Sequence, residues 1–333
     1  MIPLRKNNNV SSDDIKNLVK THYATLMQAF YESQSAFLCG IYKKYKSVET
    51  ASIVLCFFRN VHLEIIRQRE KDLNFNVSLE NFNKNLNKIN LRPEKITAIV
   101  KTTSIPKETA RRKIKNLTNK GYLVKDKKNK GYCWGLPEKD KESFFEVIND
   151  ETKNLSLFIS KIVNDLNINL NTKIIEEEIR SQFSFYWYHY LSCQLDWLKW
   201  WQAKLKDNDL LLIALQAVIP TLNYIDKNSD GVNLNNLFKN IGQINKNASR
   251  CSINPSSVSD ITGIPRATCI RKLEKLVNLG FLSREEKTKR YSVNQSIDAR
   301  TKNILSKENV DFTLDTFGEY ITIILNSLIH NKL

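Results

Sequence analysis

The sequence has few of the residues that interrupt helices or that mark catalytic and metal sites. Its 333 residues include 9 glycines, 7 prolines, 2 methionines and 4 histidines. The four histidines (His22, His62, His189 and His330) are scattered, and the sequence contains no HExxH, GxSxG or phosphate-loop motif. We therefore expect a protein that is not an enzyme, with no catalytic residues and no cofactor.

Cysteine pairs and long apolar runs are missing as well. The six cysteines form no CxxC spacing and mostly stand among apolar residues, a pattern typical of reduced thiols in a cytoplasmic protein and not of a disulfide framework or a zinc site. The longest apolar stretch, 210–220, is interrupted by Gln216 and is too short to span a bilayer. The start of the chain, MIPLRKNNNV, has no apolar core. We expect no secretory signal, no membrane partner and a cytoplasmic location.

Acidic residues are fewer than basic ones, and most of the difference lies in two segments of the chain. The chain has 51 Lys and Arg against 35 Asp and Glu, a net charge of +16. Residues 92–130 contain 13 basic and three acidic residues, and residues 250–290 contain nine basic and four acidic ones. Charge gathered on two segments indicates a polyanionic partner. The alternative interpretation is a solvated, lysine-rich surface.

These two basic segments belong to an internal repeat. Residues 104–123 and 263–282, which lie 159 positions apart, are identical at nine of 20 positions. The same offset pairs Tyr31 with Tyr190 and Leu63 with Leu222. We predict a duplicated unit of about 160 residues, with a first repeat at 10–168 and a second at 169–333. The length suits two domains of ordinary size.

Apolar helices are expected on both sides of each basic segment. The apolar residues of 26–41 recur at helical spacing, and the apolar run 51–66 predicts a buried helix. Pro220 is expected to kink or end the buried helix of the second repeat. The further helices that the spacing predicts are 79–89 and 139–166 in the first repeat, and 183–201, 210–225, 234–244 and 313–329 in the second.

The basic segment of the first repeat predicts two short helices and a hairpin. Residues 93–101 suit a helix with Pro93 in its first turn, and Ser104 and Pro106 stand where an N-cap and a first-turn proline belong. After them, Ala110, Ile114 and Leu117 recur at core spacing, and Gly121 suits the position after a helix end. Strands are expected at 122–125 and 131–135. The second repeat follows with Cys269, Leu273, Leu276 and Gly280, then strands at 281–284 and 290–293.

Helix, turn, helix and hairpin is the order of a winged helix-turn-helix. The run TGIPRATCIRKLEKLVNLGFL at 262–282 resembles the recognition helix and wing entry of bacterial winged-helix regulators of the IclR and MarR families. The resemblance covers about 92–136 and 251–295. It implies a mainly α fold with small β-hairpin wings, in which long helices at both ends form a dimer interface. Together with the repeat, it predicts two tandem winged helix-turn-helix domains with a pseudo-two-fold relation in one chain.

The outward face of each second helix supplies the candidate DNA contacts. Residues near the start of a recognition helix contact base edges, which selects Lys107, Thr109 and Arg111, and Arg266 and Thr268 in the second repeat. Basic residues further along the helix and in the wing suit phosphates. The full predicted set is Ser104, Lys107, Thr109, Arg111, Arg112, Lys113, Lys115, Lys127, Lys128 and Lys130, with Arg266, Thr268, Arg271, Lys272, Lys275, Lys287, Lys289 and Arg290.

An aromatic block at 183–201 has two interpretations. Core packing between the repeats is favoured, because its large side chains recur at helical spacing. The alternative is a pocket for a small aromatic effector, lined by Tyr190, Trp200 and Trp201, as the resemblance to effector-sensing regulators implies.

The sequence thus predicts a cytoplasmic, sequence-specific transcription regulator that binds double-stranded DNA. We expect a monomer acting as a pseudo-dimer, which binds two non-identical half-sites at 1:1 stoichiometry. The alternatives are a plasmid or phage replication initiator that binds origin repeats, and a ligand-sensing regulator.

Overall fold

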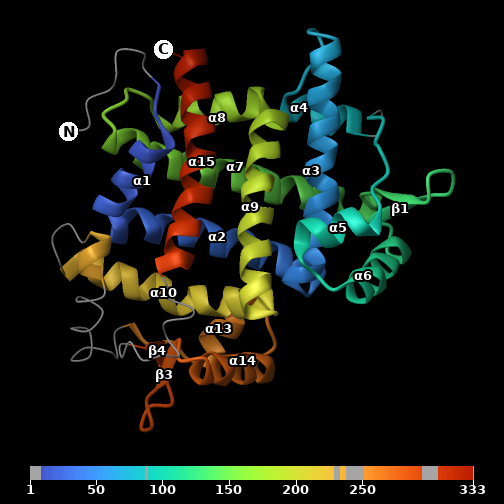
Figure 1. The fold of residues 1–333 in the computed structure, drawn as a ribbon. Helices are drawn as coiled ribbons and strands as arrows, with labels where there is room; N and C mark the ends of the chain where they lie inside the picture. Colours follow the sequence, from blue (N-terminus) through green and yellow to red (C-terminus); the bar gives the residue numbers. More distant parts are fainter. Residues whose placement is uncertain (1–8, 87–88, 229–232, 238–250, 295–306, 333) are drawn as a thin grey trace. The chain divides into compact units, whose positions relative to one another are not determined.

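The computed structural model describes residues 9–86, 89–228, 233–237, 251–294 and 307–332 (Figure 1). This part of the chain is mainly helical, with two small two-stranded antiparallel sheets, which confirms the mainly α part of the expected fold class. It divides into two compact units. Unit 1 contains residues 1–48 and 207–322, and unit 2 contains residues 49–206 and 323–333.

The two units do not follow the predicted domain boundary at residue 168. Unit 1 joins the opening helices of the first repeat to the basic segment of the second repeat. Unit 2 joins the basic segment of the first repeat to the opening helices of the second. The predicted division at 10–168 and 169–333 does not coincide with these units, because each unit takes its opening helices from the opposite repeat.

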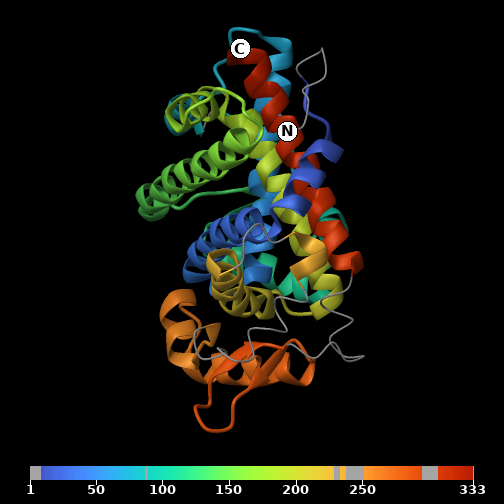
Figure 2. The same ribbon diagram turned by 90° about the vertical axis from the view of Figure 1, so that its left-hand side faces the viewer.

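In unit 1, α10 lies between α2 and the pair α13 and α14, as both ribbon views show (Figures 1 and 2). α2 packs along α10, and the hairpin strand β4 also contacts α10. The elements of unit 1 are α1 (Ser12–Thr21), α2 (Tyr23–Tyr45), α10 (Asn208–Asn228), α13 (Pro255–Thr262), α14 (Arg266–Asn278), β3 (Leu282–Arg284), β4 (Tyr291–Val293) and the part of α15 (Lys307–Lys332) up to Thr322.

The core of unit 1 forms around α10. Leu210, Leu212, Ile213 and Ala217 have no exposed surface, and each fully buried Leu or Ile contributes about 1.5–3 kcal/mol. The amide Nε2 of Gln216 donates to Ser35 Oγ of α2 at 2.8 Å, which satisfies a polar group inside this interface. Among the described residues, α10 is the one helix long and apolar enough to cross a membrane, and 67% of its most apolar window is buried inside the structure.

In unit 2, α7 packs along α8, and α9 packs against α5. Unit 2 therefore also combines segments from the two repeats. Its elements are α3 (Val48–Lys71) from Glu49 onward, α4 (Leu79–Asn85), α5 (Ile96–Thr103), α6 (Lys107–Asn119), β1 (Leu123–Asp126), β2 (Gly131–Trp134), the short 3₁₀ helix η2 (Glu138–Asp140), α7 (Lys141–Asp165), α8 (Thr172–Ser181), α9 (Phe183–Leu205) and the end of α15.

The core of unit 2 contains an aromatic cluster around a buried histidine. The ring of His62 lies 4.6 Å from that of Phe58, 5.2 Å from that of Phe82 and 5.1 Å from that of Phe183. Its two nitrogens have no hydrogen-bond partner among the described residues. Burial lowers the pKa of His62 to about 3, so the ring is neutral at physiological pH and acts as a packing group.

Helix ends of the opening segments recur 160 residues apart. The first pair of helices in each segment is separated at His22 and at Gln182, with φ of −107° and −108°. The second helices end at Lys46 and Lys206, which are left-handed with φ of 59° and 56°. The pairing of Tyr31 with Tyr190 and of Leu63 with Leu222 is therefore wrong by one residue. The 159-residue offset applies to the basic segments, and the opening segments follow an offset of 160.

Two further helix predictions need correction or fall outside the described residues. α10 does not end at Pro220 but continues to Asn228. The carbonyl of Gln216 has no backbone N–H donor four residues later, because residue 220 is proline. At the neighbouring carbonyl of Ala217, Thr221 Oγ1 donates a hydrogen bond at 2.8 Å. The predicted helix 234–244 extends beyond the described range 233–237.

Candidate nucleic-acid interface

The two basic segments share one turn geometry. α5 ends at Ser104 and α13 ends at Gly263, both left-handed with φ of 56° and 72°. α6 and α14 then begin after Pro106 and Pro265, whose φ and ψ differ by only two degrees. The prediction that Ser104 is an N-cap is wrong. It closes α5, because its backbone N–H bonds to the carbonyl of Val100 and its left-handed conformation cannot continue a helix.

A buried threonine and isoleucine hold each turn in place. Thr103 Oγ1 donates to the carbonyl of Ile99 at 2.8 Å and accepts from the N–H of Ile105 at 3.3 Å. Thr262 makes the same pair of bonds to Val258 and Ile264. Ile105 and Ile264 are 1% and 0% exposed. The angle between the two helices is thus set in the same way in both segments.

The ends of α6 and α14 also match. At the end of α6, the N–H of Tyr122 bonds to the carbonyl of Leu117, and the N–H of Gly121 bonds to that of Thr118. The same bonds recur at Phe281 and Gly280, and the two glycines have φ of 79° and 77°. This is the Schellman arrangement, which requires a residue that tolerates positive φ. The predicted role of both glycines is confirmed.

A two-stranded hairpin follows each of these helices, and a third segment touches it. β1 pairs with β2, and β3 pairs with β4, in antiparallel register. Glu94 forms an isolated bridge with Tyr132, and Ile253 forms the equivalent bridge with Tyr291. The prediction that Pro93 starts a helix is wrong, because the backbone is engaged by the hairpin here and α5 begins only at Ile96.

The core positions predicted for α6 and α14 are confirmed. Ala110, Ile114 and Leu117 are 0%, 0% and 1% exposed. Cys269, Leu273 and Leu276 are likewise buried, at 0%, 0% and 1%. The opposite face of each helix is therefore left to charged and polar side chains.

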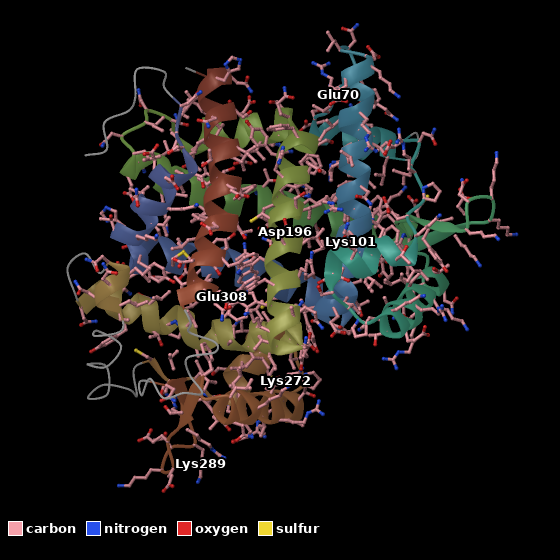
Figure 3. All side chains as sticks on the ribbon, viewed as in Figure 1. Glu70, Lys101, Asp196, Lys272, Lys289 and Glu308 are labelled. Carbon is pink, nitrogen blue, oxygen red and sulfur yellow. The ribbon has the colours of Figure 1, made fainter. Side chains whose placement is uncertain are left out.

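Most of the predicted contact residues lie on that opposite face or in the hairpin tip. Lys289 projects from the tip between β3 and β4 (Figure 3), and its φ of 57° matches the 52° of Lys130 in the other hairpin. Thr109 and Thr268 are partly exposed, and Arg290 is partly exposed with its guanidinium donating to Ser252 Oγ at 3.4 Å. The exposed residues are Ser104, Lys107, Arg111, Arg112, Lys115, Lys127, Lys128 and Lys130 on the α6 surface, and Arg266, Arg271, Lys275, Lys287 and Lys289 on the α14 surface.

Lys113 and Lys272 do not belong to these surfaces. Lys113 Nζ lies 3.4 Å from Glu49 Oε2 and donates to Thr50 Oγ1 at 2.9 Å. Lys272 Nζ lies 2.6 Å from Asp207 Oδ2 and 3.5 Å from Asp209 Oδ2, and its side chain is 10% exposed. The predicted phosphate role of both lysines is wrong, since each ammonium group is bound to the start of α3 or α10.

These lysines instead fix the second helix of each segment to the long helix of its unit. The acids lie at the N-terminal ends of α3 and α10, where negative charge is also stabilised by the helix dipole. Sequence spacing missed this role because Glu49 lies 64 residues before Lys113, and Asp209 lies 63 residues before Lys272.

Neighbouring substitutions in α14 should separate this structural role from a binding role. Lys272→Ala leaves Asp207 and Asp209 together without their cation, and we expect it to lower the free energy of unfolding by about 3 kcal/mol. Arg271→Ala, one residue earlier and exposed, should change stability by less than about 0.5 kcal/mol. Urea denaturation followed by circular dichroism measures both. Equal stability of the two variants would contradict the assignment.

The two surfaces differ at one charged group in particular. Glu274 occupies the position equivalent to Lys115, and its Oε1 accepts from Arg284 at 2.7 Å and from the Tyr291 hydroxyl at 2.6 Å. Burial, reinforced by the neighbouring carboxylate, raises the pKa of Tyr291 to about 12, so its hydroxyl stays protonated and donates. The predicted set omitted Lys125, the exposed equivalent of Arg284. Its place just before the hairpin tip could have pointed to it.

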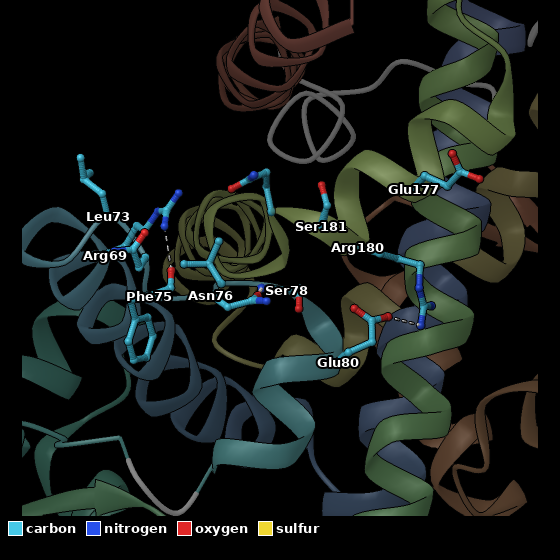
Figure 4. Close-up of a pocket in the computed structure, with 12 residues that line it drawn as sticks. Arg69, Leu73, Phe75, Asn76, Ser78, Glu80, Glu177, Arg180 and Ser181 are labelled. Carbon is cyan, nitrogen blue, oxygen red and sulfur yellow. Dashed lines mark hydrogen bonds and ion pairs between the residues drawn. The ribbon is translucent and has the colours of Figure 1, made fainter.

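The aromatic side chains proposed as an effector pocket pack mainly within unit 2. Tyr190 is 2% exposed and donates its hydroxyl to Glu151, whose pKa is raised by burial to about 7. Lys204 Nζ lies 4.7 Å from the ring centre of Trp200. An open pocket of about 650 Å³ in the same unit is lined by other residues, from the end of α3, the 73–80 segment and α8 (Figure 4).

That pocket gives no support to an anionic effector. Its two guanidinium groups are used by the chain, because Arg69 donates to the carbonyl of Phe75 at 3.1 Å and Arg180 pairs with Glu80 at 3.1 Å (Figure 4). Within the described residues, no group of three or more metal-ligating side chains is present. The candidate interface therefore consists of the α6 and α14 surfaces.

The chain matches no family model, and the comparisons with curated proteins and with solved structures find no match.

Proposed function

We propose that the protein is a sequence-specific, double-stranded DNA-binding transcription regulator, with two winged helix-turn-helix domains in one chain. The observation that carries the proposal is the recurrence of one local geometry at α5–β2 and α13–β4. The threonine bonds of the turn, the bonds at the helix end and the bridge to the hairpin recur in both segments, and each segment presents a face of exposed basic side chains. A solvated lysine surface alone requires neither the shared geometry nor its repetition.

The residues of each surface have distinct roles in this proposal. Lys107 and Arg266 occupy the first positions of α6 and α14, where a recognition helix contacts base edges in the major groove. Arg112 and Arg271 lie one turn further on and bind phosphates, which position the protein without reading sequence. The lysines of the hairpin tips contact the neighbouring phosphate backbone of the DNA.

Selection of bound fragments from a random duplex pool tests the function directly. We expect one enriched site with two unequal halves, because Arg111 and Lys115 are replaced by Ile270 and Glu274 in the second helix. A promoter-proximal imperfect palindrome supports regulation, whereas tandem origin repeats support a replication initiator. Failure to enrich any sequence contradicts specific recognition.

Substitutions should then distinguish residues that contact bases from residues that contact phosphates. Lys107→Ala or Arg266→Ala is expected to relax specificity at one base pair, by about 1–3 kcal/mol of discrimination. Arg112→Ala should weaken all sequences about equally. Competition binding against single-base variants of the selected site measures both effects. Lys173→Ala on α8, with a side chain 86% exposed, is the matched control and should change neither.

A further inference from the structure

The α6 and α14 surfaces carry different charge at equivalent positions. Between Lys107 and Gly131 there are ten basic and two acidic residues, against eight basic and three acidic between Arg266 and Arg290. The difference is concentrated where the second helix faces its hairpin. Lys115 and Lys125 are both exposed in the first segment, while Glu274 and Arg284 replace them and form an ion pair at 2.7 Å in the second.

The Glu274 carboxylate is held in place by two hydrogen bonds, whose donors also contact each other. Arg284 and Tyr291 both donate to its Oε1, and the Arg284 guanidinium lies 5.6 Å from the centre of the Tyr291 ring. The side chains of Glu274 and Arg284 are 37% and 40% exposed, so this group is open to solvent beside the outward face of α14. Arg284 is engaged by Glu274, so this pair adds no net charge at the positions where the other segment has Lys115 and Lys125.

We propose that the two surfaces bind DNA unequally, and that Glu274 is the residue that makes the difference. This inference rests on the proposed function. The α6 surface supplies most of the sequence-independent affinity, because each of its exposed cations can neutralise a phosphate and release a counterion. On the α14 surface Glu274 and Arg284 neutralise each other and supply no cation for a phosphate, which lowers affinity for every sequence alike.

The α14 surface therefore depends more on base contacts. A surface with fewer cations available to phosphates gains less sequence-independent affinity, so base-edge bonds supply a larger share of its binding and its specificity is higher. Arg266 at the start of α14 is exposed, and its Nε donates to Ser256 Oγ at 3.1 Å. This bond holds the guanidinium near the helix start, where base readout occurs.

Charge changes at the equivalent pair of positions test this division in the full-length protein. The probe is a duplex of random sequence, titrated at two salt concentrations by fluorescence anisotropy. Lys115→Glu should weaken binding about tenfold or more and lower the salt slope by at least about 1. Glu274→Lys should strengthen binding to the same duplex by a similar factor and raise the slope.

Glu274→Gln serves as a second variant, because it removes the charge while an amide oxygen remains to accept from Tyr291. It should strengthen random-duplex binding severalfold and reduce discrimination between the selected site and a random duplex. Melting curves of each variant verify folding. If wild type binds DNA and neither Glu274 variant binds the random duplex more tightly, the division between the surfaces is overturned while the proposed function stands. If wild type binds no duplex at any salt concentration, the proposed function itself is overturned.

Discussion

Raising the salt concentration from about 50 to 200 mM is expected to weaken DNA binding on the order of 10³-fold. The expectation follows from the exposed cations of the two surfaces. Lys107, Arg112 and Lys115 on α6, and the lysines of both hairpin tips, are all exposed. Neutralising about six phosphates releases enough condensed counterions to give a loss of this size. Binding constants measured at four or five salt concentrations give the slope.

Replacing a single lysine that contacts a phosphate should lower the slope of the binding constant against salt concentration. Lys128→Ala, at an exposed hairpin tip, is expected to reduce it by about 1. Lys113→Ala is the informative comparison, because that lysine is bound to Glu49 and Thr50 and should alter stability more than slope. A nearly flat salt dependence in the wild-type protein would remove nucleic acid from the proposal.

Local features of both basic segments could be predicted from the sequence because their causes are local. Helix ends at Gly121 and Gly280 depend on positive φ, which few residues other than glycine adopt readily. The buried faces of α6 and α14 follow from apolar spacing within one helix. The hairpins follow from their short polar tips. Each of these features is settled within about ten residues of chain.

Two errors arose where a side chain had two acceptable environments. Ser104 suits an N-cap by composition, but the structure uses it as a left-handed helix end, the position that Gly263 fills in the second segment. Lys113 and Lys272 lie at the border between the inward and outward faces of their helices. Spacing alone cannot place such a residue, since the deciding acid is distant in sequence.

The exchange of opening helices could not be predicted, for a reason that lies in the repeat itself. α2 packs along α10 in unit 1, and α9 packs against α5 in unit 2. Because the two repeats carry similar apolar faces, α2 could bury its apolar residues against either long helix at similar local cost. The spacing of apolar residues is the same in both arrangements. Which long helix α2 packs against therefore depends on contacts throughout the chain and not on the local sequence.

Cutting the chain between the repeats should therefore not separate them. With a protease recognition sequence inserted after the exposed Asn169, the products 1–169 and 170–333 are expected to remain in one complex after cleavage. Each unit contains segments of both products: Ser35 of α2 bonds to Gln216 of α10, and Phe30 packs on Phe317 at 4.9 Å. In unit 2, Tyr190 of α9 bonds to Glu151 of α7.

Size-exclusion chromatography with light scattering, before and after cleavage, distinguishes this arrangement from two independent domains. The cleaved protein should elute as a single species of the intact mass and retain its helical circular dichroism, and the two products should separate only in denaturant. The uncleaved insertion variant controls for damage to the buried neighbours Ile168 and Leu170. Two species that separate under native conditions would show that each repeat folds on its own. Retained association would mean that the stability of each basic segment depends on helices from the opposite repeat, since the exchanged apolar faces leave water only when both products are present.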